Sequence, residues 1–416
     1  MKFRFQAILV ATAACILLVV SCSTPPAGPS SVQGPLILVS IDGFRWDYLQ
    51  KYDVPTLRQL AASGAHAKRM TPCYPSKTFP NHYTLVTGLR PEHHGIVSNW
   101  FFDPAFDDTF DMGKPASNAE SRWWGGEPVW ITAERQGVRS ACFFWPGSEM
   151  ENHDTRPTFY RAFDKKLSAA DRVDGLLEWL GRPAAERPRL CTLYFDLVDH
   201  AGHTFGPEAA ETAAAAHEAD GAIARLLAGL EKLQLRASTN LVIVSDHGMS
   251  ETSPDRVVFI DDLVELSKVK VEATGPYGGV RPKPGEDVAA LVAAIRAKAP
   301  SQVKVYRREE MPARLFYDTG DRIPPIVLVM EDHWCIEQKA GWPLLRLRYN
   351  KGNHGWDPAT PNMGALFLAN GPAFKPGVEI PDVENIHVYD LLCAVLGIKP
   401  APNDGDDRLV RAVVRR

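Results

Sequence analysis

Four short runs of apolar residues, separated by longer stretches with helical spacing, constrain the fold of this chain more than any other feature. Each run is rich in Val, Ile and Leu and has the length of one buried strand. The stretch 208–233 is Ala-rich and repeats apolar residues at helical spacing, which predicts a helix. Buried strands that alternate with helices predict an α/β fold with a central, mostly parallel β-sheet and helices on both faces. The predicted strands are LILVSI (36–41), LCTLYF (190–195), LVIVS (241–245) and ALFLA (365–369).

The N-terminus resembles a bacterial lipoprotein signal. Lys2 and Arg4 precede an apolar stretch, 7–20, that is interrupted only by Thr12 and is shorter than the ~20 residues of a membrane-spanning helix. The stretch leads into Cys22, the position that carries lipid after cleavage in such signals. We therefore predict a signal peptide over 1–21 and a lipoprotein of the bacterial cell envelope, periplasmic or anchored to the outer membrane. An ordinary secretory signal with an incidental Cys22 is the alternative.

The rest of the chain is predicted to form one domain behind a short linker. Residues 22–35 are rich in Pro, Ser and Gly, which is typical of a flexible tether. Residues 254–350 combine short β-like pieces with many Pro and Gly, so we expect an insertion within a domain that covers 36–405. The 46 Lys and Arg against 50 Asp and Glu leave no basic surplus, which argues against a nucleic-acid binding surface. We expect a monomer.

Carboxylate and imidazole groups directly follow three of the predicted strands. A parallel α/β sheet places its ligand sites beyond the carboxyl ends of the strands, so these side chains should meet at one edge. Both group types are ligands for zinc and similar divalent ions. Each element alone is more often a surface feature or a turn, but four of them together favour a metal site. They are Asp42, the pair Asp199 and His203, the pair Asp246 and His247, and His354 within GNHGWDP (352–358).

Thr78 lies in the polar segment 71–88, directly before Phe79-Pro80. Proline is favoured in the first turn of a helix, so Thr78 is predicted at a helix N-terminus. A hydroxyl there faces the positive end of the helix dipole and free N–H groups, which suits a phosphate. A plain helix cap is the alternative role.

Five strings of residues resemble the nucleotide pyrophosphatase/phosphodiesterase family of the alkaline phosphatase superfamily. The resemblance implies an alkaline-phosphatase-like fold and two zinc ions, with Thr78 as nucleophile. One ion would be held by Asp42, Asp246 and His247 together with Thr78, and the other by Asp199, His203 and His354. It also implies that Asn99 binds a phosphate oxygen and that Phe79 and Tyr194 flank a nucleobase, although both could be ordinary core aromatics. The strings are ILVSIDGFRWDYL (37–49), PSKTFPNHYTLVTGLRPEHHGIVSN (75–99), YFDLVDHAGHTFGP (194–207), SDHGM (245–249) and GNHGWD (352–357).

The expected activity is zinc-dependent hydrolysis of nucleotide phosphodiester and phosphoanhydride bonds through a covalent threonine intermediate, with nucleoside monophosphates as products. The expected partners are a small nucleotide or other phosphodiester and, through a lipid on Cys22, a membrane. Two alternatives stay open: the same chemistry on lipid or choline-type phosphodiesters, and a non-catalytic metal-binding lipoprotein.

Overall fold

The computed structural model describes residues 34–150 and 155–415. The predicted signal peptide (1–21), Cys22 and all but the last two residues of the predicted tether (22–35) lie outside these residues. In the described part of the chain, no helix is both long enough and apolar enough to cross a bilayer. The described cysteines are all buried and free: Cys73, Cys142, Cys191, Cys335 and Cys393.

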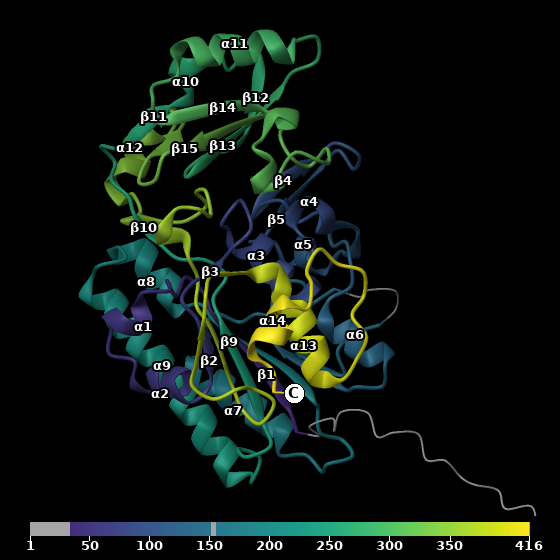
Figure 1. The fold of residues 1–416 in the computed structure, drawn as a ribbon. Helices are drawn as coiled ribbons and strands as arrows, with labels where there is room; N and C mark the ends of the chain where they lie inside the picture. Colours follow the sequence, from purple (N-terminus) through teal and green to yellow (C-terminus); the bar gives the residue numbers. More distant parts are fainter. Residues whose placement is uncertain (1–33, 151–154, 416) are drawn as a thin grey trace, which may run out of the picture. The chain divides into compact units, whose positions relative to one another are not determined.

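The central sheet has eight strands in the order β19-β2-β18-β9-β1-β8-β6-β7. Figure 1 labels β1, β2 and β9 of this sheet. Its pairings are parallel except where β18 lies between β9 and β2, so the prediction of a mostly parallel sheet is confirmed. β18 is antiparallel because the chain enters it from the carboxyl edge of the parallel strands. The strands are β1 (Leu36–Ile41), β2 (Ala65–Ala67), β6 (Ser140–Phe143), β7 (Phe159–Arg161), β8 (Leu190–Phe195), β9 (Asn240–Val244), β18 (Phe367–Asn370) and β19 (Val378–Ile380).

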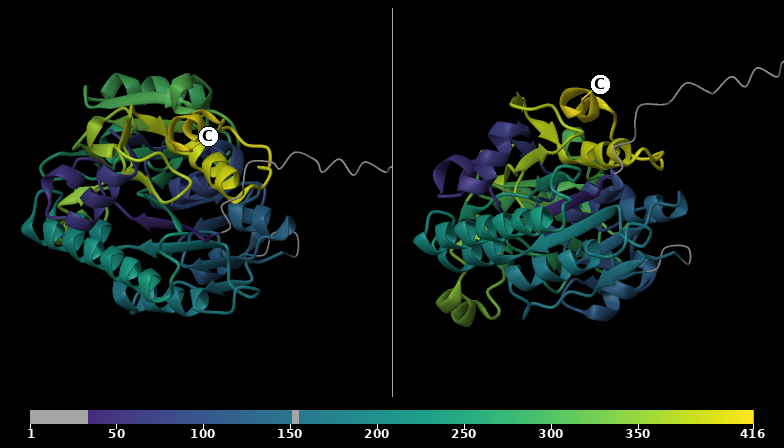
Figure 2. Two further views of the ribbon diagram at one scale, coloured as in Figure 1. Left: turned by 60° about the horizontal axis from the view of Figure 1, so that its bottom comes forward. Right: turned by 90° about the horizontal axis from the view of Figure 1, so that it is seen from below.

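Alternate residues of β1 face two different hydrophobic layers, as expected for a strand that is buried on both faces. Leu36 and Leu38 belong to the layer with α3 (Thr78–Thr87), α6 (Val129–Arg135) and α13 (Val388–Leu396). The second layer contains Ile37, Val39 and Ile41. It is covered by α2 (Pro55–Ser63), α7 (Ala169–Leu180) and α9 (Ala210–Lys232), the last of which is the helix predicted over 208–233. Helices therefore cover both faces of the sheet (Figures 1 and 2).

A smaller antiparallel sheet lies within the range 254–350, which was predicted as an insertion. Its strand order is β12-β13-β15-β14, and α11 (Val288–Lys298) contributes to a third hydrophobic cluster beside it. The boundaries of the predicted domain, 36–405, stay a prediction, and α14 (Arg408–Val413) follows them. The strands of the small sheet are β12 (Val269–Ala273), β13 (Tyr277–Pro282), β14 (Val303–Arg307) and β15 (Ile326–Met330).

Two short strands just outside the two ends of this range pair with each other in a separate two-stranded sheet. β10 (Ser250–Glu251) pairs antiparallel with β17 (Gly352–Asn353), with Ser250 opposite Asn353. His247 precedes β10 by three residues and His354 directly follows β17. The pair therefore brings two imidazoles, far apart in the sequence, to the same edge of the main sheet.

Candidate active site

Three aspartates meet where β1, β8 and β9 end. Asp42 directly follows β1, and Asp246 follows its neighbour β9. Gly43 stands between them with a positive φ of 68°, and its N–H donates to Asp246 Oδ1 at 3.1 Å. A Cβ at this glycine would lie 2.9 Å from Asp199 Cα, so only glycine allows the turn after β1 to approach Asp199 this closely.

The second group of side chains comes from α8 (Leu197–Phe205) and from the loop after β17. Asp199 and His203 are four residues apart and therefore lie on one face of α8. Asp199 Oδ1 is 3.4 Å from His203 Nε2 and 3.6 Å from His354 Nε2. The Nε2 atoms of His203 and His354 are 3.1 Å apart. Three ligand-type atoms from two distant segments thus converge on one point.

All three imidazoles are oriented by backbone carbonyl groups. The Nδ1 atoms of His203, His247 and His354 lie 2.8, 2.9 and 2.8 Å from the carbonyl oxygens of Gly352, Gly248 and Ser76. A carbonyl oxygen can only accept, so Nδ1 carries the proton in each ring and Nε2 presents a lone pair. The rings of His247 and His354 stack with their centroids 3.5 Å apart. This is the arrangement in which histidines bind a metal through Nε2.

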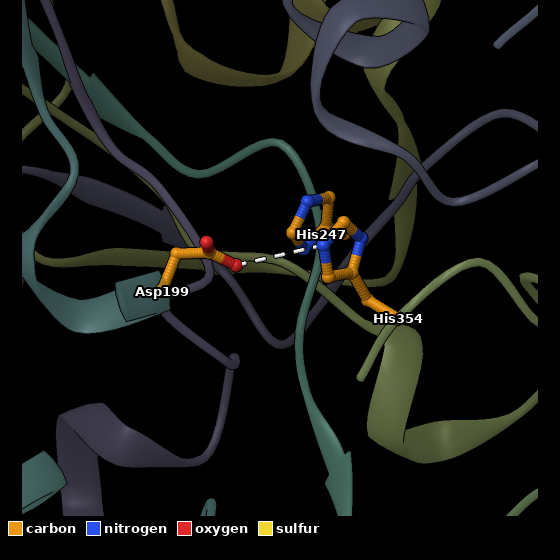
Figure 3. Close-up of side chains that lie close together, drawn as sticks. All are labelled: Asp199, His247 and His354. Carbon is orange, nitrogen blue, oxygen red and sulfur yellow. Dashed lines mark ion pairs between the residues drawn. The ribbon is translucent and has the colours of Figure 1, made fainter. Parts of the chain in front are cut away.

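Each of the three carboxylates has one buried oxygen that is available to a cation. Asp42 Oδ1, Asp199 Oδ1 and Asp246 Oδ2 are buried without a hydrogen-bond partner. Asp246 Oδ2 lies 2.8 Å from His247 Nε2, which makes an ion pair when the ring is protonated and leaves two acceptor atoms side by side when the ring is neutral. Two candidate metal groups result, each with its ligand atoms within 4.8 Å of one another: Asp42, Asp246 and His247, and Asp199, His247 and His354 (Figure 3). The second group includes His247 where His203 was predicted, and His203 lies beside it.

The buried charges of the site shift the pKa values of Asp42 and Asp246 in opposite directions. Burial raises the pKa of Asp42 well above its ordinary value, and the negative charges of Asp246 and Asp199 raise it further. Without a metal ion, burial would also raise the pKa of Asp246, but the positive charges of protonated His247 and His82 outweigh it and hold that pKa well below its ordinary value. Burial opposes a charge on His247, but Asp246 outweighs it and raises the pKa of His247 in turn, so the ring must give up this proton before it can bind a metal ion. A proton and a metal ion therefore compete for the same buried atoms. The donor set, three carboxylates and three neutral imidazoles, fits two divalent cations.

Thr78 is the first residue of α3, as predicted, and its hydroxyl faces the candidate metal groups. Thr78 Oγ1 lies 3.3 Å from His247 Nε2. One turn further along α3, His82 is fully buried, with Nδ1 2.9 Å from the Thr78 carbonyl oxygen and 3.3 Å from Asp246 Oδ2, and with Nε2 2.8 Å from Ser40 Oγ. His82 was not among the predicted site residues. Its spacing of four residues from Thr78 on one helix was the signal that could have identified it.

The structure places Asn99 and Phe79 at the start of α3. Asn99 Oδ1 accepts a hydrogen bond of 2.8 Å from the Phe79 N–H, one residue after Thr78. The amide NH₂ of Asn99 remains as the donor group of this side chain. Phe79 is partly exposed and packs against Phe110 and Trp124, with centroid distances of 5.9 and 6.1 Å.

Tyr194 was predicted to flank a nucleobase, and in the structure its hydroxyl bonds to Asp42. It lies in β8, is buried, and its hydroxyl donates a hydrogen bond of 2.6 Å to Asp42 Oδ2. This bond occupies the second oxygen of a predicted metal ligand and leaves Asp42 Oδ1 for the ion. Whether Tyr194 also flanks a nucleobase stays a prediction.

Lys77 adds a cation next to Thr78. Its Nζ lies 3.5 Å from Asn353 Oδ1, which places its side chain beside the loop that carries His354. Burial lowers the pKa of Lys77 to about 8.

A buried set of carboxylates and imidazoles beside a threonine, at the carboxyl edge of a mostly parallel sheet, is the architecture of a metal-dependent phosphoester hydrolase. The family model described as type I phosphodiesterase/nucleotide pyrophosphatase matches residues 36–357. The chain belongs to this family of hydrolases, in the alkaline phosphatase superfamily.

Relatives from several organisms support this membership. An uncharacterized pyrophosphatase/phosphodiesterase of Schizosaccharomyces pombe is 38% identical over 388 residues, which are 91% of this chain and 80% of the relative. A venom phosphodiesterase of Macrovipera lebetinus is 39% identical over 385 residues, 90% of this chain. Human ectonucleotide pyrophosphatase/phosphodiesterase family member 1 is 37% identical over 381 residues, 89% of this chain. The chain spans only 44% and 41% of the length of these last two relatives.

Solved structures of the same family share the fold. Murine ectonucleotide pyrophosphatase/phosphodiesterase 5 has a TM-score of 0.86 and 33% identity, and the match covers 92% of this chain and all of that one. An inactive variant of the murine protein, solved in complex with AMP, matches with the same TM-score and identity. The predicted fold class is therefore confirmed.

Proposed function

We propose that the protein is a two-zinc phosphodiesterase that hydrolyses nucleotide phosphodiester and phosphoanhydride bonds and releases nucleoside monophosphates. The observation that carries this proposal is the position of the Thr78 hydroxyl, 3.3 Å from His247 Nε2 and beside both candidate metal groups. Asp42, Asp246 and His247 would hold one zinc ion, and Asp199, His203 and His354 the other. When bound, zinc lowers the pKa of a coordinated hydroxyl and offsets charge on phosphoryl oxygens.

Thr78 supplies the nucleophile. Its Oγ1 gives up its proton and forms a bond to phosphorus as the bond from phosphorus to the leaving oxygen breaks, which gives a phosphothreonine diester and a leaving group that takes up a proton from solvent. Water then attacks the same phosphorus, its oxygen stays on the released nucleoside monophosphate, and the bond from phosphorus to Oγ1 breaks as Oγ1 takes up a proton to restore the Thr78 hydroxyl. Asn99 is bound to the Phe79 N–H through Oδ1, so its amide N–H groups can donate to a phosphate oxygen. His82 holds the Thr78 carbonyl and Asp246 in one network and so orients the nucleophile.

Two observations support a nucleotide as substrate. An inactive variant of the murine relative was solved in complex with AMP, and its fold matches 92% of this chain. Phe79 is partly exposed beside Thr78 and offers an apolar face for a base. A phosphodiester carries a single negative charge and a second substituent that such a face can accommodate.

The first experiment compares hydrolysis of a nucleotide phosphodiester by the wild type and by Thr78→Ala and Thr78→Ser. We expect Thr78→Ala to lose roughly a thousandfold or more of kcat, since the nucleophile is removed, whereas Thr78→Ser retains the hydroxyl and measurable turnover. Full activity of Thr78→Ala would refute the nucleophile. Inactivity of the wild type towards every phosphodiester tested would favour a non-catalytic metal-binding lipoprotein.

A second comparison separates nucleotides from choline-type diesters. We expect a higher kcat/KM for a nucleotide diester than for glycerophosphocholine. Faster release of choline would overturn the nucleotide proposal while leaving the two-metal chemistry intact.

We also propose that the protein is a bacterial envelope lipoprotein with its lipid on Cys22. The proposal is supported by the N-terminal sequence pattern. Incorporation of a labelled fatty acid into the wild type but not into Cys22→Ala would support the anchor, and a wild type without the label would refute it.

A further inference from the structure

The loop 342–348 presents apolar side chains to solvent without cover. Leu347 and Leu344 are 83% and 70% exposed, and Leu345 is 37% exposed. No other large hydrophobic side chain in the described residues exceeds 48% exposure. Soluble surfaces tolerate single exposed leucines, but three within four residues on one projecting segment mark a contact surface. The 342–348 loop contains α12 (Trp342–Leu345) and the 3₁₀ turn Arg346–Arg348.

The base of the loop is held firmly while its tip remains exposed. The Trp342 ring packs edge-on against Phe259 and Tyr349, with centroid distances of 5.3 Å to each. The Tyr349 hydroxyl donates to Glu337 Oε1 at 3.0 Å. The leucines therefore project from an anchored turn, which is yellow-green in Figure 1 and stands out from the domain in the right-hand view of Figure 2.

The charges within the loop are positive, whereas acidic side chains lie near its base, where Asp262 pairs with Lys339 and Asp255 with Arg346. Between Lys339 and Lys351 the sequence contains Arg346 and Arg348 and no acidic residue. Arg346 forms an ion pair of 3.1 Å with Asp255, but both side chains are more than half exposed, so the pair is weak and solvated. Leucines flanked by arginines, with a tryptophan at the base, are typical of segments that lie at the interface of an anionic bilayer.

The loop also adjoins the candidate active site. Asn350 Nδ2 lies 3.3 Å from His203 Nδ1, and the Lys351 N–H donates to the His203 carbonyl oxygen at 2.9 Å. Leu347 precedes Asn350 by only three residues, a distance of at most roughly 11 Å along the chain. A surface that covers the leucines would therefore lie close to the His203 side of the site.

We propose that the 342–348 loop is a membrane-docking element that inserts Leu344 and Leu347 into an anionic lipid surface, with Arg346 and Arg348 at the level of the headgroups. This docking role of the 342–348 loop goes beyond the proposed phosphodiesterase activity and does not rest on it. It is also separate from Cys22, because it needs no attached lipid.

The test is co-sedimentation with vesicles, using the chain from Ser23 onward so that no lipid is attached. This chain includes the compact unit 32–416. We expect binding to vesicles of phosphatidylethanolamine and phosphatidylglycerol, weaker binding at high salt, and little binding to phosphatidylcholine alone. The double variant Leu344→Ser, Leu347→Ser should bind at least roughly tenfold more weakly, because both apolar anchors are lost. Arg346→Gln with Arg348→Gln should abolish the preference for phosphatidylglycerol.

Met112→Ser is the matched control, because Met112 is 44% exposed and directly follows β5 (Asp108–Asp111), outside the 342–348 loop. It should bind like the wild type, and all variants should hydrolyse a soluble diester at the wild-type rate. Binding that is absent, or unchanged in the leucine variant, overturns the proposal. So does a wild-type dimer that the leucine variant converts to monomer without any vesicle binding, since a second copy would then cover the loop. Binding is measured without turnover, so its failure is independent of a failure of the proposed activity.

Discussion

The Nε2 atoms of His203 and His354 lie 3.1 Å apart although neither nitrogen carries a proton to share with the other. Both rings give their Nδ1 proton to a backbone carbonyl, of Gly352 and Ser76 respectively. Two lone pairs at this distance repel each other unless a cation lies between or beside them. The relationship between these two imidazoles is therefore the structural signature of a metal site, with Asp199 as the neighbouring anion.

The first prediction concerns metal removal. A chelator should abolish hydrolysis and lower the melting temperature, because three carboxylates are left crowded in a buried site. Zinc should restore both; a ligand at a hundred times its Kd stabilises the folded state by about 2.7 kcal/mol. Metal analysis should find two zinc equivalents in the wild type and a reduced content in His354→Ala. Full activity in excess chelator would exclude the metal-dependent mechanism.

The second prediction separates two roles for Tyr194. Tyr194→Phe keeps the ring but removes the hydroxyl that donates to Asp42 Oδ2. We expect zinc affinity to fall roughly 10- to 100-fold, because hydrogen bonds to metal ligands orient them, while KM at saturating zinc changes little. Zinc titration of activity measures both quantities. An unchanged zinc affinity would indicate that the hydroxyl does not support the metal site.

Site residues could be predicted from the sequence where their position follows from a single strand or helix, and could not where it depends on how two strands pair. Asp42 and Asp246 could be placed because each follows a buried strand, and the edge at which parallel strands end is a general rule. The hydrogen bond from Tyr194 to Asp42 could not be predicted from the sequence, because it depends on the register of β8 against β1. This register sets Tyr194 opposite Ser40. The sharing of His247 between two candidate groups depends likewise on the pairing of β10 with β17.

For the fold, too, individual strands and helices could be predicted from the sequence, but the direction of one strand could not. Hydrophobic runs and helical spacing predicted α9 and four of the eight strands of the main sheet, β1, β8, β9 and β18, since burial on both faces leaves a clear pattern. The remaining strands, β2, β6, β7 and β19, were not predicted; they are only three or four residues long. The direction of β18 leaves no mark on its own residues. It follows from the position of His354, which returns the chain to the carboxyl edge before β18 begins.

The third prediction tests Asn99. Asn99→Asp preserves an oxygen that accepts from the Phe79 N–H but replaces the amide donor with a negative charge near the phosphate. We expect kcat/KM to fall roughly 10²- to 10³-fold, with the melting temperature nearly unchanged. Steady-state kinetics and thermal unfolding measure the two effects. Equal loss of stability and activity would mean that Asn99 serves only to hold the start of α3.

The fourth prediction concerns pH and stability. His94 is fully buried; its Nδ1 accepts from the Ile96 N–H, so Nε2 is the protonated nitrogen and faces the Pro80 carbonyl oxygen. Burial lowers the pKa of His94 to about 3, whereas the unfolded chain binds the proton near pH 6.5. The unfolded state therefore gains protons first as the pH falls, and stability is lost between pH 6.5 and 3 by up to about 1.4 kcal/mol per pH unit.

The variant that tests this prediction is His94→Gln, which keeps an acceptor and a donor but does not titrate. Urea unfolding at pH 7 and pH 5 should show a smaller loss of unfolding free energy for the variant than for the wild type, and equal losses would show that His94 does not control the acid sensitivity.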